Sequence, residues 1–348
     1  MHSKVPFCLT FGIEPSNAIK RIKDTNEVIS SFSGDLSSNY LYFITGLRGS
    51  GKTVLLSSIA SKLSEDKNWI VVDPGPKDNI LENVASEIYE TTKAKKLFVK
   101  GEFSFSFHGL TFSLKGDEPV TTVNTLLKKM LGYLKDKNKK VLITIDEIDN
   151  SDQMKTFIQA YQSLLRLKYP LYLLMTGLYE NVSKLQEDKS LTFLYRAPKI
   201  RLEPLYIGSI ASAYETYLNS TKETSLELAK LTKGYAYAYQ VLGYLMFGKG
   251  LRDLTPEVLS EFDQYLADYV YDKIYSELSK KEQEILHGFK EDRPMKIEEL
   301  SLVTNIDSKI ISVYRDRLIK RGILYSPTYG YLEITLPRFI NYLETKYI

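Results

Sequence analysis

The chain has 348 residues, of which 43% are hydrophobic and 26% are charged, and its formal net charge is only +3. This composition is typical of a globular protein, and the length exceeds one ordinary hydrophobic core, so we expect two or three domains. One cysteine, Cys8, and three scattered histidines exclude an intrachain disulfide framework and a cysteine-based zinc cluster. The single cysteine fits a reducing cytoplasm. No segment approaches the ~20 apolar residues that cross a bilayer, so we expect a soluble protein without a membrane partner.

A glycine-rich loop follows the first predicted strand, Tyr40 to Thr45. It matches the pattern Gly-x4-Gly-Lys-Ser/Thr with Gly46, Leu47, Arg48, Gly49, Ser50, Gly51, Lys52 and Thr53. Glycines leave backbone N–H groups free to surround a polyphosphate, while the lysine supplies charge and the threonine hydroxyl can bind magnesium. A predicted helix from Ser50 to Leu63, which includes Val54, directs its positive end toward the phosphates. The alternative is a turn that needs glycine for steric reasons alone.

The next predicted elements alternate between strand and helix, with one insertion. A strand at Trp69 to Val72 precedes helices near Asn79 to Thr92 and Val120 to Lys137. Between those helices, Phe103 to Phe107 and Leu110 to Leu114 alternate in polarity around His108-Gly109, which predicts a β-hairpin within residues 97–115. Its aromatic side either contacts a partner or packs on the domain, and both interpretations stay open.

An acidic pair follows a second buried strand, Val141 to Ile145. Asp146 at the carboxyl end of that strand can hold Mg2+, and Glu147 can orient a water and take its proton. The alternative is a buried strand followed by solvated acids. A further strand, Leu171 to Met175, ends at Thr176-Gly177, and right-handed crossovers stack these strands in parallel. The sequence therefore predicts an α/β parallel-sheet core that binds a polyphosphate together with Mg2+.

The remainder of the chain is predicted to be mainly helical. Leu205 to Tyr275 has helical spacing, and three further helices (Lys280–Phe289, Ile297–Val303, Ser308–Arg321) precede a hairpin at Ile323 to Ile334. This is the element order of a winged helix. Its third helix carries the candidate DNA-binding side chains, namely Lys309, Ser312, Arg315, Arg317 and Lys320. Acidic residues nearly balance the bases, so duplex DNA and a docked protein both remain as partners.

Four segments together resemble the AAA+-type ATP-binding proteins related to archaeal initiator ATPases and to the STAND class. These segments are Tyr40–Thr53, Val141–Asp149, Thr176–Val182 and Lys233–Gln240. The resemblance implies a P-loop ATPase of the additional-strand class.

The resemblance also implies roles for single residues. Phe11 and Ile13 would pass close to the adenine, although an apolar segment pinned to the domain explains them equally well. Thr176 would sense the γ-phosphate or hold the attacking water, or else would only cap a turn. Arg196 would act on a neighbouring subunit's phosphate in a homo-oligomer, or else would be a surface arginine. AAA+ lids carry an arginine at the start of a late helix, where it contacts the nucleotide, but no arginine is present in the segment that follows Gly234.

These predictions define three domains: a nucleotide-binding core at 1–204, a helical lid at 205–275 and a winged helix at 276–348. The implied function is a slow ATPase, binding ATP and ADP, whose nucleotide state controls DNA binding through the winged helix. The alternative is a STAND-like signalling or scaffold protein with little turnover, whose winged helix docks a protein partner.

Overall fold

The computed structural model describes residues 5–10, 12, 15–34, 39–76, 79–91, 94–96, 103–106, 111–114 and 122–346. Backbone contacts divide the chain into two compact units. The first unit comprises Met1–Lys20, Gly46–Gly51 and Leu202–Ile348, and the second comprises Arg21–Thr45 and Lys52–Arg201. The chain therefore passes from one unit to the other at both ends of the glycine-rich loop.

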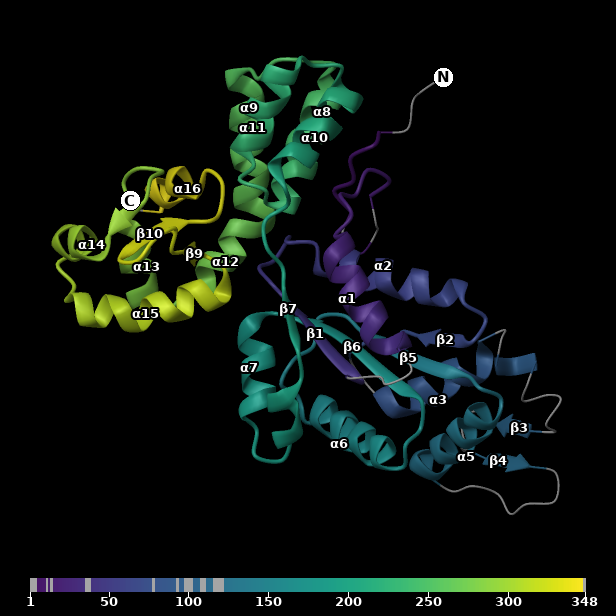
Figure 1. Cartoon of the computed structure of the whole chain (residues 1–348). Helices are drawn as coiled ribbons and strands as arrows, with labels where there is room; N and C mark the ends of the chain where they lie inside the picture. Colours follow the sequence, from purple (N-terminus) through teal and green to yellow (C-terminus); the bar gives the residue numbers. More distant parts are fainter. Residues whose placement is uncertain are drawn as a thin grey trace. The chain divides into compact units, whose positions relative to one another are not determined.

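A five-stranded parallel sheet forms the centre of the second unit (Figure 1). Its strands are β1 (Leu41–Thr45), β2 (Trp69–Val72), β5 (Lys140–Ile145), β6 (Leu171–Gly177) and β7 (Lys199–Arg201), in the order β2-β5-β6-β1-β7. Parallel strands covered on both faces are apolar throughout, and every residue of β1 and β6 is buried. Strand β6 lies between β1 and β5, so the two strands that precede the sequence motifs are separated by one strand.

Side chains alternate between the two faces of this sheet, and they are buried on both, so helices cover both faces. On one face, α3 (Ile80–Glu90), α5 (Val123–Asp136), α6 (Asp152–Arg166) and α7 (Tyr179–Glu187) share a core with strand residues such as Phe43, Ile143 and Leu173. The other face carries α1 (Ile22–Ser33) and α2 (Lys52–Glu65). There Phe32 of α1 packs against the rings of Tyr42 and Tyr172.

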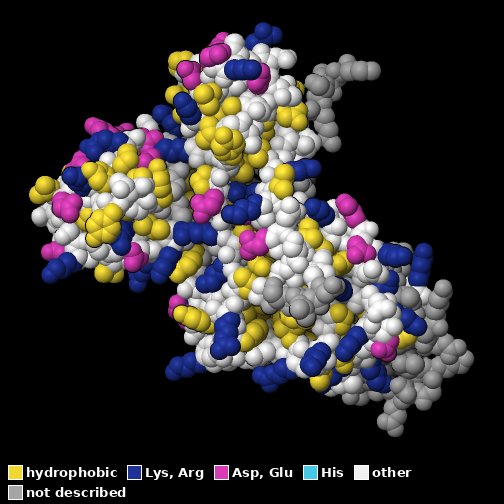
Figure 2. Space-filling view, viewed as in Figure 1, with side chains coloured by type: hydrophobic (Ala, Val, Ile, Leu, Met, Phe, Trp, Pro, Cys, Tyr) yellow, Lys and Arg dark blue, Asp and Glu magenta, His cyan; other side chains and the backbone are white. Residues whose placement is uncertain are grey.

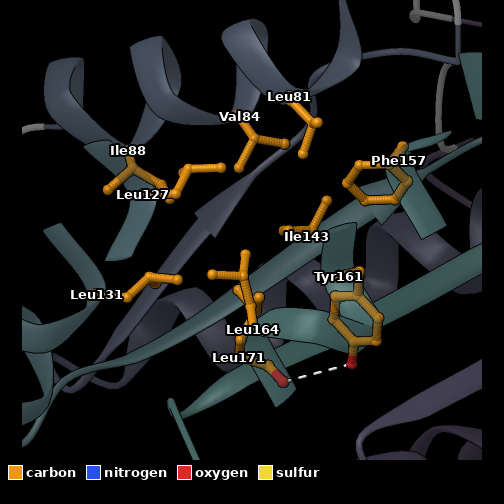
Figure 3. Close-up of a pocket in the computed structure, with 10 residues that line it drawn as sticks. All are labelled: Leu81, Val84, Ile88, Leu127, Leu131, Ile143, Phe157, Tyr161, Leu164 and Leu171. Atoms are coloured by element: carbon orange, nitrogen blue, oxygen red, sulfur yellow. Dashed lines mark hydrogen bonds between the residues drawn. The ribbon is translucent and has the colours of Figure 1, made fainter. Parts of the chain in front are cut away.

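An apolar cavity lies between the sheet and the helices α3, α5 and α6 (Figure 3). Leu81, Val84 and Ile88 of α3 face Leu127 and Leu131 of α5 across it. Among its ten lining residues, Tyr161 brings the one side-chain hydroxyl, which donates to the Leu171 and Tyr40 carbonyls at 3.4 and 2.6 Å. This cavity belongs to the hydrophobic core, and its ten lining residues include no charged side chain that could bind the phosphates of a nucleotide.

The predicted hairpin insertion is present. Strands β3 (Phe103–Ser106) and β4 (Thr111–Leu114) pair antiparallel, with Phe103 opposite Leu114 and Ser106 opposite Thr111. Its predicted tip, Phe107 to Leu110, lies outside the described residues.

The first unit is helical up to its carboxyl-terminal part. Helices α8 (Ile207–Leu218), α9 (Lys222–Leu231), α10 (Ala236–Lys249) and α11 (Pro256–Leu266) pack side by side (Figure 1) and are followed by a π-helical turn, Ala267–Tyr271, and α12 (Asp272–Ser276). The amino-terminal segment packs on this bundle through Phe7, against which Gly243 of α10 lies so closely that a Cβ there would be 2.2 Å from the ring.

The carboxyl-terminal part combines helices α13 (Lys280–His287), α14 (Ile297–Thr304) and α15 (Ser308–Arg321) with an antiparallel sheet of order β8-β10-β9, whose first strand lies between α13 and α14 in the chain. These strands are β8 (Met295–Lys296), β9 (Leu324–Tyr325) and β10 (Tyr331–Ile334), and α16 (Phe339–Thr345) follows. This arrangement is compatible with a winged helix. It shares one hydrophobic core with the α8–α12 bundle, and Arg338 bonds Asp263 of α11 at 2.8 Å.

The predicted α/β class with a parallel sheet is confirmed, and the predicted strands agree with the observed ones to within two residues. The division into three domains stays a prediction. None of the described helices is long and apolar enough to cross a membrane.

Candidate nucleotide site

The glycine-rich loop joins the end of β1 to the start of α2. Gly49 and Gly51 have φ values of +69° and +91°, a conformation that L-residues with side chains rarely adopt. Lys52 is the first residue of α2 and is only 8% exposed, while Thr53 and Val54 follow in its first turn. Within the first unit, Leu47 packs on the hydrophobic core, and the Arg48 guanidinium bonds Glu277 at 2.8 Å.

A group of hydroxyl and carboxyl oxygens gathers in the second unit at the carboxyl ends of β5 and β6. Thr53 Oγ1 donates to Asp146 Oδ2 at 2.7 Å, and Thr176 Oγ1 donates to Asp146 Oδ1. The Thr176 hydroxyl also accepts the backbone N–H of Glu147 at 2.9 Å, and its side chain has no exposed surface. Because β5 and β6 are parallel neighbours, residues that follow or end them meet at one edge of the sheet.

The turn after β5 is held in an uncommon backbone conformation. Glu147 has a φ of +55°, which is unfavourable for a residue with a Cβ, and its side chain is exposed. Two further bonds fix the turn: the Ile148 N–H donates to the Thr176 carbonyl at 2.9 Å, and Asn181 Nδ2 donates to the Ile148 carbonyl at 3.0 Å. The sequence patterns did not predict this role of Asn181, since it depends on a contact between segments that are 33 residues apart.

A further carboxyl group, which the sequence patterns also missed, adjoins this edge of the sheet. Asp73 follows β2, the strand that pairs with β5, and its N–H donates to Glu87 Oε2 at 2.6 Å. Desolvation raises the pKa of Asp73; a hydrogen bond from Thr144 opposes this, and the charge of Asp146 adds to it. Asp73 therefore lies close enough to Asp146 for the two charges to interact.

The oxygens of Thr53 and Asp146 fit Mg2+, which prefers hydroxyl, carboxylate and water oxygens. The two side chains lie within hydrogen-bond distance, so a small cation can reach both with little rearrangement.

The other predicted site residues lie elsewhere. Arg196 is exposed on a short 3-10 helix, Thr192–Arg196, in the second unit. Phe11 and Ile13, the predicted adenine contacts, lie outside the described residues.

The predicted DNA-binding residues all belong to α15, but they differ in their surroundings. Lys309, Arg317 and Lys320 are exposed, whereas Arg315 bonds the neighbouring Asp316 at 2.9 Å and the Ser312 hydroxyl donates to the Ser308 carbonyl at 2.8 Å. Large apolar side chains are exposed on α14 and α15 as well: Leu302 (86%), Val303, Ile310 and Val313 (62%). Figure 2 shows exposed hydrophobic, basic and acidic side chains intermixed on this part of the chain.

Two parts of the chain are similar to known protein families. Residues 25–172 match the family described as "ATPase domain predominantly from Archaea", and residues 268–343 match a domain of unknown function, DUF8462. No curated protein shows significant similarity.

Similar solved structures extend over nearly the whole chain. A Walker-type ATPase of Pyrococcus abyssi is 14% identical, with a TM-score of 0.67 over 94% of this chain and 97% of its own. The ORC2 protein of Aeropyrum pernix, solved in ADPNP-ADP complexes, is 14% identical, with a TM-score of 0.58 over 97% of this chain and 96% of its own. Because the sequence identity is so low, these structural similarities establish the fold alone.

Proposed function

We propose that this chain is a switch that binds and slowly hydrolyses ATP. The match of residues 25–172 to the archaeal ATPase domain family and the fold shared with solved ATPases support the proposal. The observation that carries the proposal is the bond of 2.7 Å between Thr53 Oγ1 and Asp146 Oδ2, because it joins the two motifs that a P-loop ATPase needs. The Aeropyrum pernix ORC2 structure with ADPNP and ADP supports the choice of an adenine nucleotide.

Each residue has a specific task in this proposal. The N–H groups of the glycine-rich loop surround the phosphates, Lys52 offsets their charge, and Thr53 and Asp146 hold Mg2+. Mg2+, when bound, neutralises charge that develops on the phosphate oxygens. Glu147 orients a water and accepts its proton, and Thr176 fixes the backbone of Glu147 and one oxygen of Asp146.

Isothermal titration calorimetry with ATP and Mg2+ tests nucleotide binding. We expect heat of binding for the wild type and a loss of at least tenfold in affinity for Lys52→Ala, since that variant removes the buried charge at the start of α2. Lys62→Ala is the matched control, because Lys62 lies on the same helix and bonds only the exposed Asn26 among the partners described. A folded wild-type protein without binding heat would refute the proposal.

The C-terminal part, residues 276–348, provides the output of the switch in this proposal. Exposed Lys309, Arg317 and Lys320 support duplex DNA as its ligand. The exposed Leu302, Ile310 and Val313 instead favour a protein partner, because apolar side chains of this size gain most when another protein surface covers them.

The salt dependence of DNA binding separates these two outputs. Replacing Lys309, Arg317 and Lys320 together by alanine is expected to reduce the slope of log K against log salt by about 3 for duplex DNA, since each lost phosphate contact removes about 0.9. An unchanged slope, or no affinity for DNA, would favour the protein partner.

We also propose that Arg196 acts on the phosphate bound by a neighbouring subunit. Phosphate release and molecular size, each measured with and without DNA, test this role. Faster release in a larger assembly would support it, and full release by a monomer would exclude it.

A further inference from the structure

The glycine-rich loop is bonded to the start of α10 through two successive backbone carbonyls. The Tyr235 hydroxyl donates to the Arg48 carbonyl, and the Tyr237 N–H donates to the Gly49 carbonyl at 3.0 Å. Tyr237 lies in the first turn of α10, where N–H groups have no partner within the helix, so the loop supplies one of the missing acceptors. Burial raises the pKa of Tyr235 well above its ordinary value, which keeps this hydroxyl protonated and able to donate.

Steric contact accompanies these two bonds. A Cβ at Gly49 would lie 2.5 Å from Tyr235 Oη and 2.8 Å from Tyr237 Cβ, so only glycine permits this approach. In a trans peptide the N–H points away from the carbonyl. Tyr235 therefore turns the N–H of Gly49 away from α10, which leaves that group available to an anion.

The same loop contacts the part of the first unit that follows α12. Arg48 Nη2 bonds Glu277 Oε1 at 2.8 Å, and Arg321 at the end of α15 bonds the Glu277 carbonyl at 3.4 Å. Gly322 adjoins Leu47 of the loop, where an added Cβ would lie 3.4 Å from Leu47 Cγ. Arg48 is thus held at two points, by Tyr235 through its backbone and by Glu277 through its side chain.

We propose that Tyr235 and Glu277 are positioning residues that connect the nucleotide loop to residues 278–346, with Arg48 as the shared contact. The inference rests on the proposed binding of ATP at this loop. Tyr235 sets the orientation of the loop peptides, and the Arg48–Glu277 pair transmits a change of the loop to α13–α16. Because coupling between sites is reciprocal, a ligand of residues 278–346 also changes the affinity for nucleotide.

Nucleotide affinity tests the role of Tyr235. Tyr235→Phe removes one hydrogen bond, so its dissociation constant for a fluorescent ATP analogue with Mg2+ is expected to rise about two- to tenfold. Its turnover at saturating ATP stays near that of the wild type, so the change falls on KM rather than kcat. Tyr237→Phe is the matched control, since Tyr237 bonds the loop through its backbone and keeps that bond. Wild-type affinity in a folded Tyr235→Phe protein would overturn this role.

Hydrogen exchange of residues 278–346 tests the role of Glu277. In the wild type, the ATP analogue is expected to change exchange in this segment, and Glu277→Gln is expected to lose that response while still binding the analogue. Glu284→Gln is the control, because Glu284 pairs with Lys281 within α13. A full response in Glu277→Gln would overturn the connection. A wild type that binds nucleotide without any response would overturn it too, yet leave the ATPase proposal intact, whereas a wild type that binds no nucleotide would refute both.

Discussion

Replacing Thr176 by valine is expected to destabilise the second unit by about 2–4 kcal/mol. The substitution keeps the shape of the side chain and removes a hydroxyl that has no exposed surface. Valine leaves the N–H of Glu147, now bonded at 2.9 Å, without its acceptor, which costs about 1–3 kcal/mol. It also removes a donor to Asp146, and we assign this loss about 1 kcal/mol because Asp146 is only half-buried and water can replace the donor.

Urea unfolding followed by tryptophan fluorescence measures this effect in the second unit. The chain has one tryptophan, Trp69, and it is buried in β2, so its emission reports on the sheet that contains Thr176. Thr176→Ser retains the hydroxyl and is expected to lose much less stability. The reasoning would be refuted if Thr176→Val unfolded at the wild-type urea concentration, or if the serine variant were as unstable as the valine variant.

Further predictions concern catalysis, pH and packing. Glu147→Gln is expected to bind ATP normally and to lower the rate of phosphate release by about 10²–10⁴-fold, because it removes the proposed base; normal release would exclude that role. Partial burial, with a smaller contribution from Lys290, lowers the pKa of His287 below 6.5, so the unfolded chain binds more protons and stability falls as pH drops from about 6.5 toward the folded pKa. His287→Gln should therefore lose less stability between pH 7.5 and 5.0 in urea titrations followed by circular dichroism, and an equal loss would contradict the shift. Leu131→Ala, beside the apolar cavity, is expected to cost about 2–5 kcal/mol by Trp69 fluorescence, and a cost below 1 kcal/mol would show that the helices collapse around the void.

The site is expected to respond to Thr53 and Asp146 as a pair rather than as independent residues. Since the two side chains share a bond of 2.7 Å, Thr53→Ala and Asp146→Asn should not be additive in their effect on the Mg2+ requirement for nucleotide binding. Additive losses, measured by titrating Mg2+ against each single variant and the double variant, would contradict a shared metal site.

The amino-acid sequence predicted much of the fold because its local patterns are strong. The apolar segments of β1, β5 and β6 have no competing periodicity, and the loop at Gly46–Thr53 combines glycines with Lys52 in a spacing that few other structures need. Local patterns also defined the ends of α15, where Asp307 caps the first turn and Gly322, with a φ of +85°, follows the last. Helices α1 and α16 were not predicted, since α1 has few apolar residues and α16 has only seven residues, so both depend on their neighbours in the fold for stability.

Contacts between distant segments decided the rest. The sequence identified Thr176 and Asp146 separately, but only the parallel pairing of β5 with β6 brings the hydroxyl to the carboxylate. Likewise, the sequence showed only that the segment of Tyr235 lacks the arginine found in the lids of the AAA+-type proteins that it resembles. The hydrogen bond from the Tyr235 hydroxyl to the Arg48 carbonyl, 187 residues away, is formed only in the folded chain. The physical reason is that periodicity and spacing report on a residue's own strand or helix, whereas a hydrogen bond between such elements depends on how the entire core packs.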